Sequence, residues 1–186
     1  MAVTFTTSGT ASAGGVQQTY ALQHNPLLEG QLSDIRDNTI GTYVNETGAV
    51  LAFGNVLTYA SGGTVANSAK TIAGTGETVV GINVLTYVDE TATDTNGRPG
   101  VKDKQALNVA NEGAVAVYVH GAVNPSTPVR VIHTASGTER AGQFRAAAAS
   151  GRTAVLSNAR YLTSTTGSGL AVVELNGPSF TLTANA

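Results

Sequence analysis

The stretch Gly113-Ala114-Val115-Ala116-Val117-Tyr118-Val119-His120 decides the fold of this chain. Strand side chains alternate between the two faces of a sheet, so its three valines share one face and Ala116, Tyr118 and His120 share the other. The stretch contains the longest unbroken apolar run of the sequence. The alternation predicts a β-strand. The run is far shorter than the roughly 20 residues that span a bilayer, so we predict no membrane partner.

Similar apolar runs, separated by Gly, Asn and Ser, lie on both sides of this stretch. The 186 residues include 26 Thr and 21 Val, whose branched Cβ suits a pleated surface. The sequence therefore predicts an all-β fold, an antiparallel β-sandwich or barrel-like body with an extended N-terminal arm. Besides 114–120, the predicted strands are residues 49–59, 78–88, 129–133, 141–145, 152–156, 160–163 and 169–175.

The chain divides into an arm, a body and a tail. Residues 1–19 are small and polar without periodicity, and predict a flexible arm that either orders against a partner or stays frayed. Residues 20–177 form the predicted β-rich body, as one unit or as two subdomains of about 20–125 and 126–177, and residues 178–186 form a tail. Within the body, residues 89–103 predict a polar surface loop, and Gly137 fits a hairpin turn.

Residues 20–37 carry a cluster of apolar side chains around Pro26 and Gly30, which block a continuous helix. We expect an extended, packed segment. Apolar groups at the centre of an interface contribute most of its binding energy, so this segment is the predicted interaction site. Packing of Leu27 and Leu28 in the domain's own core is the equal alternative. The predicted interface residues are Tyr20, Leu22, Leu27, Leu28, Leu32 and Ile35.

Charge is distributed unevenly along the chain. Residues 1–129 hold five basic and ten acidic side chains, a net −5, whereas residues 130–186 hold five Arg and two Glu, a net +3. Complementary charge sets the orientation of contacts more than their affinity. The polarity therefore suggests head-to-tail contacts or docking on a patterned surface, with uneven sampling of few charges as the alternative.

Residue types needed for catalysis are scarce. The chain has no Cys, which excludes disulfides and thiolate chemistry, and no nucleophile motif surrounds His24, His120 or His133. The acidic residues of 89–103 miss the spacing of a calcium loop, and no Gly-rich stretch continues into a phosphate loop. Lys and Arg are scattered without interleaved aromatics, which argues against a nucleic-acid partner. We predict a protein that is not an enzyme, with no catalytic residue, metal or cofactor.

Several short motifs follow one another in a characteristic order. They are Leu27-Leu28-Glu29-Gly30-Gln31-Leu32-Ser33-Asp34, Gly48-Ala49-Val50 with Phe53-Gly54, Val79-Val80-Gly81-Ile82, Gly113-Ala114-Val115-Ala116-Val117, Gly142-Gln143-Phe144-Arg145, Ala159-Arg160-Tyr161-Leu162 and Ala171-Val172-Val173-Glu174-Leu175. In this order, over most of residues 26–177, the chain resembles the bacteriophage structural cement, or capsid decoration, family.

The resemblance implies a virion structural protein, made in the bacterial host cytoplasm, that binds the outer surface of the capsid. Such a protein stabilises contacts between subunits of the major capsid protein and associates with itself as a homotrimer or homodimer. The resemblance brings no catalytic residues. A phage tail, fibre or baseplate component is the alternative, and a small hydrolase with an unrecognised site is the second.

Overall fold

The computed structural model describes residues 27–34, 37–60, 63, 66–86, 91–177 and 179–185, and this part of the chain forms strands and turns without a helix. The prediction of an all-β fold is confirmed. The strands are β1 (Thr39–Asn45), β2 (Leu51–Ala52), β3 (Val56–Tyr59), β4 (Ser68–Thr71), β5 (Val79–Asn83), β6 (Thr91–Thr93), β7 (Pro99–Val101), β8 (Ala106–His120), β9 (Arg130–Ile132), β10 (Phe144–Arg145), β11 (Thr153–Leu156), β12 (Ala159–Tyr161), β13 (Gly169–Asn176) and β14 (Leu182–Ala184).

Five strands close into a barrel. They neighbour one another in the order β1, β4, β3, β5 and β8, and β8 pairs back onto β1. The pairings are antiparallel except between β1 and β4. Side chains from these strands and from the small β2–β7–β6 sheet form a buried cluster that includes Leu57, Ala69, Val101 and Leu107. The barrel-like alternative of the sequence prediction is therefore the observed one.

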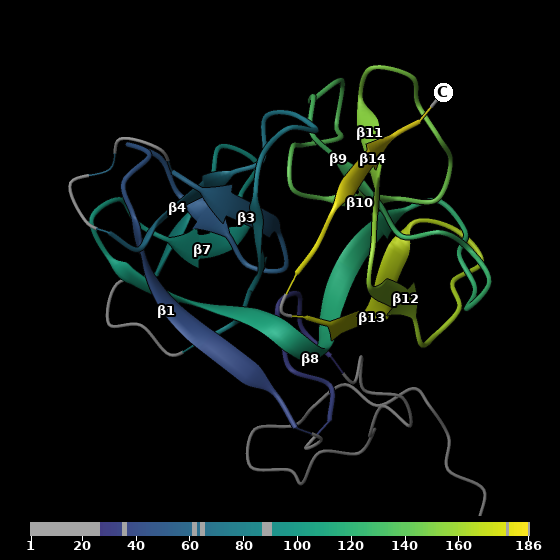
Figure 1. Ribbon diagram of the computed structural model, residues 1–186, viewed down its shortest axis with the longest axis horizontal. Coiled ribbons are helices and arrows are strands. Elements are labelled where there is room, and N and C mark those ends of the chain that lie inside the picture. The colour runs from purple at the N-terminus through teal and green to yellow at the C-terminus, as the bar shows by residue number, and fades with distance from the viewer. Residues whose placement is uncertain are drawn as a thin grey trace, which may run out of the picture.

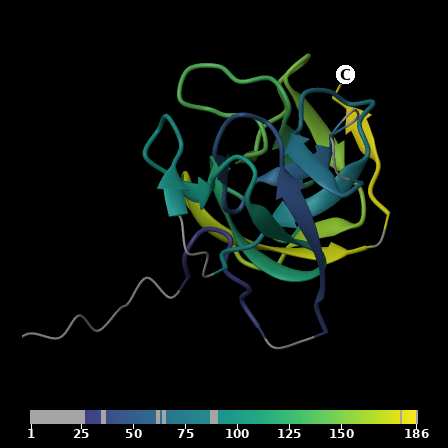
Figure 2. The ribbon, with the colours of Figure 1, turned by 90° about the vertical axis from the view of Figure 1, so that its left-hand side faces the viewer.

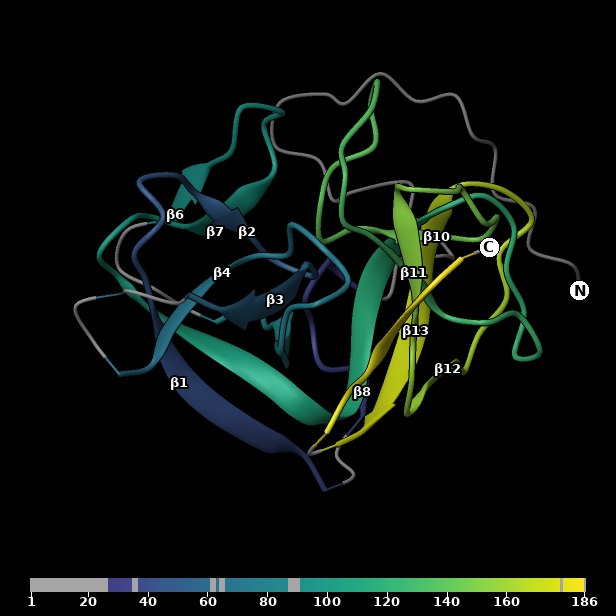
Figure 3. The ribbon, with the colours of Figure 1, turned by 45° about the horizontal axis from the view of Figure 1, so that its top comes forward.

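Strand β8 joins this barrel to the second half of the chain. In Figure 1 the strands before β8 lie on the left and those after it on the right, and Figure 3 shows β8 crossing between them. Its residues 106–112 pair with β1 and its residues 112–119 pair with β13, which runs beside it in Figure 2. The partner changes next to Gly113, where φ is 118° and a Cβ would lie 1.9 Å from Asn38 Oδ1. Only glycine fits this bend without strain.

The second half forms a sheet around the C-terminal part of β8. Strands β10, β9, β11 and β14 follow one another on one side, and β13 with β12 lies on the other. Val115, Val117 and Val119 are fully buried in the main core, together with Phe144 and Tyr161. The three valines share a face as their period-two spacing predicted.

Three segments differ from expectation. Residues 89–103 are not only a surface loop, because β6 and β7 form a hairpin there and β7 pairs with β2, which buries Gly100 and Val101. The run 49–59 is divided into β2 and β3 at Gly54, where φ is 73°. The expected tail contains β14, which pairs with β11. The predicted arm, residues 1–19, lies outside the described residues.

Candidate interaction surfaces

Residues 28–33 lie along β8 like an additional short strand. Gly30 N and Ser33 N donate to the carbonyls of Ala116 and Ala114 at 2.7 and 2.9 Å, and Ala116 N donates to Gln31 O at 2.8 Å. Leu32 bridges to Val115 in antiparallel register. The described part of the segment predicted as an interaction site is therefore fixed to the body through its backbone.

A tight turn at the start of this segment exposes Leu28. Gln31 N donates to Leu28 O at 3.0 Å, and Gly30 occupies the third position of the turn with φ of 83°, as a type II turn requires. A Cβ on Gly30 would lie 2.8 Å from Phe53 Cβ, so the turn packs closely against the body. The Leu28 side chain is 62% exposed, the largest exposure among the large apolar residues that the structure describes.

The structure describes three of the six predicted interface residues and gives them different environments. Leu28 is exposed and Leu27 is half-buried, whereas Leu32 packs against the main core. The remaining three, Tyr20, Leu22 and Ile35, lie outside the described residues. Among those described, Leu28 best fits a contact residue, because its side chain is available to a partner and its backbone is held in place.

Arg98 anchors the turn from the β6–β7 hairpin. Its Nη1 lies 3.3 Å from Glu29 Oε1 and donates to Asn55 Oδ1 at 3.1 Å, while Nε and Nη2 each lie 3.1 Å from Asp94 Oδ2. Burial raises the pKa of Glu29, with Arg98 opposing the shift and Asp94 adding to it. Burial also acts to raise the pKa of Asp94, but hydrogen bonds from the Arg98 and Asn96 N–H groups and the Arg98 charge lower it overall. One guanidinium thus holds two partly buried carboxylates.

We expect Arg98→Ala to destabilise the fold by about 1–3 kcal/mol at neutral pH, because it leaves Glu29 and Asp94 facing each other without their cation. Without Arg98 the pKa of both carboxyls rises, so both bind protons more readily in the folded state. The deficit should shrink as pH falls from 7 to about 4. Urea unfolding at several pH values measures this effect, and a deficit that is the same at every pH would contradict it.

Arg140→Ala is the matched control for Arg98→Ala. Arg140 donates to Asn96 Oδ1 and to Gly137 O, both uncharged acceptors. Its loss leaves no carboxylate without a cation, so we expect a smaller cost, below about 1 kcal/mol, with little pH dependence.

Arginines of residues 130–186, the part of the chain with net positive charge, gather at one place on the molecule. Near the hairpin at Gly137, Glu139 lies 2.8 Å from Arg145 Nε and 2.6 Å from Arg152 Nη2. With Arg140, these three arginines and one glutamate give this cluster a net charge of +2. The predicted hairpin is confirmed by the Ser136–Glu139 bridge and by the φ of 61° at Gly137.

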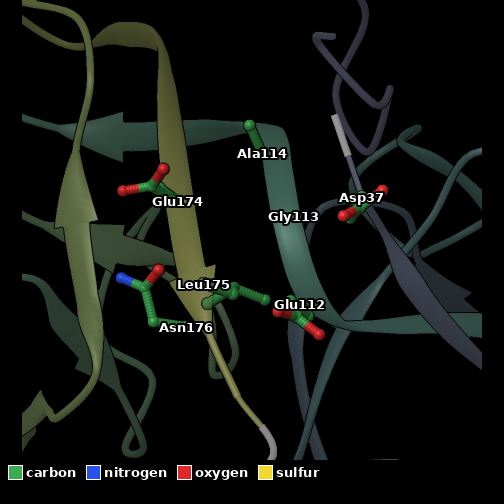
Figure 4. Close-up of a pocket in the computed structure, with 7 residues that line it drawn as sticks. All are labelled: Asp37, Glu112, Gly113, Ala114, Glu174, Leu175 and Asn176. Atoms are coloured by element: carbon green, nitrogen blue, oxygen red, sulfur yellow. The ribbon is translucent and has the colours of Figure 1, made fainter. Parts of the chain in front are cut away.

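An acidic fork, formed by Asp37 and Glu112 together with Glu174 from the net-positive part of the chain, lies where β1 and β13 diverge from β8 (Figure 4). A cavity of about 450 Å³ there is lined by Asp37, Glu112 and Glu174, among others. Glu112 accepts a hydrogen bond from Thr39 Oγ1 at 2.8 Å, and Glu174 pairs with Arg160. Partners within the chain therefore already engage two of the three carboxylates, so this fork is an electronegative surface feature and not by itself a binding site.

The two described histidines and Asp94 have structural partners, and His24 lies outside the described residues. His120 Nε2 lies 2.9 Å from Gln143 Oε1, and the His120 ring packs edge-on against Tyr118. His133 Nδ1 lies 3.0 Å from Thr134 Oγ1. Asp94 closes the turn between β6 and β7 through its hydrogen bonds with Asn96 and Arg98. Within the described ranges, no group of three or more His, Cys, Asp or Glu side chains could hold a metal ion, and no helix could cross a membrane.

The body presents an apolar side chain on a fixed turn and charged side chains elsewhere on its surface. The model of the family described as Structural cement protein (E217 gp24/Pam3 gp6) matches residues 16–176, and the chain belongs to this family. The resemblance read from the sequence is thereby confirmed. The protein is a capsid-associated structural protein with a stabilising role.

Comparison with solved structures supports the fold. A chain of the structure described as "The capsid of Myoviridae Phage XM1" superimposes with a TM-score of 0.62 at 19% sequence identity. The match covers 87% of this chain and 97% of that chain. At this level of identity the likeness shows a shared fold. No curated protein sequence matches the chain.

Proposed function

We propose that this protein binds the outer surface of a phage capsid and bridges neighbouring subunits of the major capsid protein, without making or breaking a covalent bond. Membership of the structural cement family is the observation that carries this proposal. After synthesis in the host cytoplasm, the protein joins the virion on the capsid exterior.

The turn at Leu28 supplies the contact in this proposal. Its backbone is hydrogen-bonded to β8 and its Glu29 side chain is held by Arg98, so little conformational freedom remains to be lost when the leucine is buried by a partner. The same contact repeated over an icosahedral surface gives avidity that one site lacks. Tyr20, Leu22, Leu27, Leu32 and Ile35 belong to the same proposed capsid-binding segment, with Leu32 contributing through its packing beneath the turn.

Self-association as a homodimer or homotrimer is the second part of the proposal. Closed symmetric assemblies let each copy make the same contacts with its neighbours and with the lattice beneath them. The complementary charges of the arginine cluster and the acidic fork support an oriented contact between copies.

Copy number and position in the virion test the proposal. Quantitative mass spectrometry of purified virions should give hundreds of copies, and electron cryomicroscopy should place them on the head exterior. A few to tens of copies located on the tail would instead establish the alternative of a tail, fibre or baseplate component and overturn the proposal.

A further inference from the structure

Strand β1 of the barrel has an edge that no described strand covers along most of its length. β1 pairs with β8 along Thr39–Val44 but with β4 only at Val44 and Asn45. In an antiparallel ladder, alternate residues point their N–H and C=O groups toward one neighbour. Asn45 N donates to Gln105 O and Val44 N to Asn67 O, so Ile40 and Thr42 direct their backbone groups away from β8. No described strand receives them there.

This edge lacks the usual protection against further pairing. Exposed strand edges are commonly blunted by charged residues or proline, because their unpaired N–H and C=O groups bind other strands. The sequence Thr39-Ile40-Gly41-Thr42-Tyr43 contains neither, and Ile40 is 42% exposed. The edge is therefore competent to accept another uncharged strand.

A cleft lies next to this edge. Its volume is about 410 Å³, and its walls include Tyr43 of β1, Tyr59 of β3, Val79 and Val80 of β5, and Phe180. The Tyr43 and Tyr59 rings meet edge to face with centroids 5.9 Å apart, and Tyr59 is 46% exposed. The cleft can therefore receive apolar side chains of a strand added to β1.

Asn111 places a hydrogen-bond acceptor, unpaired among the described residues, in the same cleft. It lines the wall and is the extra residue of a β-bulge, because Thr39 pairs with Glu112 and Ile40 with Ala110. Its buried Oδ1 has no hydrogen-bond partner in the described part of the chain. Buried acceptors are normally satisfied, so a donor from an incoming strand would complete this site.

The chain itself contains a segment of matching chemistry. Residues 1–26 include no Asp, Glu, Lys or Arg, and Val3 and Phe5 alternate with Thr4 and Thr6 as in a strand. Residues 8–26 can span up to about 60 Å when extended, which is enough to reach an adjacent molecule. The family match begins at residue 16, so residues 1–15 lie outside it.

We infer that residues 2–7 of one copy pair with the free edge of β1 in a neighbouring copy and place Val3 and Phe5 in the cleft between Tyr43, Tyr59 and Phe180. The inference rests on the proposed function, because it names the contact through which copies on the capsid associate. The strand backbone supplies hydrogen bonds, and the cleft selects the apolar side chains.

Disulfide trapping tests this contact cleanly, because the native chain has no cysteine. Affinity-tagged full-length Thr4→Cys is mixed with untagged full-length Thr42→Cys under mild oxidation, so only a contact between copies gives a tagged–untagged dimer. The control mixture replaces Thr42→Cys with Ser126→Cys, which lies at an exposed turn position. We expect at least ten times more of the tagged–untagged dimer with Thr42→Cys than with this control. A yield equal to the control would overturn the inference, as would a Thr4→Cys/Thr42→Cys double variant that links only within one chain.

A second pair of variants does not depend on disulfide geometry. Ile40→Lys places a charge on the edge and Phe5→Asp places one in the proposed strand, so each should weaken self-association at least tenfold by light scattering, whereas Ile40→Val should not. Unchanged self-association in both charged variants would overturn the inference. If no cross-link forms but the protein still occupies capsids normally, only the strand contact is rejected. If cross-links form but the protein does not bind capsids, only the proposed function is rejected.

Discussion

Replacing both Leu27 and Leu28 with Ser is expected to abolish most capsid binding while the body remains folded. Leu28 is 62% exposed and Leu27 half-buried, so their loss costs little core packing. Burial of a leucine side chain in an interface contributes about 1.5–3 kcal/mol, so loss of Leu28 alone should lower the affinity of each contact by about tenfold to a hundredfold, and loss of Leu27 should lower it further. Occupancy on capsids lacking the protein, measured by sedimentation and gel densitometry, gives the result directly.

The control for this experiment keeps the apolar surface. Leu27→Met/Leu28→Met retains volume and hydrophobicity, so it should bind capsids normally. Circular dichroism and the melting temperature report whether each variant folds. A Ser variant that unfolds would show that the two leucines belong to the core, the alternative that the sequence left open, and a folded Ser variant with normal binding would exclude this turn as the contact.

The largest expected effect on stability is at Tyr161. Its side chain is fully buried in the main core, and its hydroxyl has no hydrogen-bond partner among the described residues. Burial raises the pKa of this hydroxyl, with the nearby Arg130 charge opposing the shift. Tyr161→Ala should destabilise the protein by about 3–5 kcal/mol, because it opens a large cavity. Urea unfolding measures the loss.

Tyr161→Phe separates the ring from the hydroxyl. Because an unsatisfied buried hydroxyl costs roughly 1–3 kcal/mol, its removal should leave stability unchanged or raise it. Tyr118→Ala, at a half-buried position on β8, should cost less than Tyr161→Ala. A Phe variant less stable than the native protein by more than about 1 kcal/mol would indicate that the hydroxyl does have a partner in the folded state.

Strands buried on a single regular pattern were the predictable part of the fold. The valines of β8 alternate with period two, and β5, β9, β11 and β13 coincide with short apolar runs of the sequence. Strand β4 has the sequence Ser-Ala-Lys-Thr, which contains no apolar run or alternation that predicts a strand. It is a strand because it pairs with β3 and β1. The same holds for β7, where Gly100 permits close approach to β2. Tertiary contacts override weak local preference in such segments.

The interaction surfaces were predictable only in part. The apolar segment around Leu28 could be located, but which leucine faces solvent depends on tertiary contacts of the turn, such as that between Glu29 and Arg98, 69 residues apart in sequence. The free edge of β1 could not be predicted from the sequence, because whether an edge is paired depends on where the other strands lie in the fold. Charge polarity was visible in the sequence, whereas its division between the arginine cluster and the acidic fork required the folded chain.

Capsid stability measured with and without the protein tests the central claim most directly. Particles that lack it are heated alone and after the purified protein is added back, and the temperature of DNA release is recorded for both. The bridging role predicts a higher release temperature after addition, which Leu27→Ser/Leu28→Ser should fail to produce. An unchanged release temperature on particles fully occupied by the native protein would contradict it.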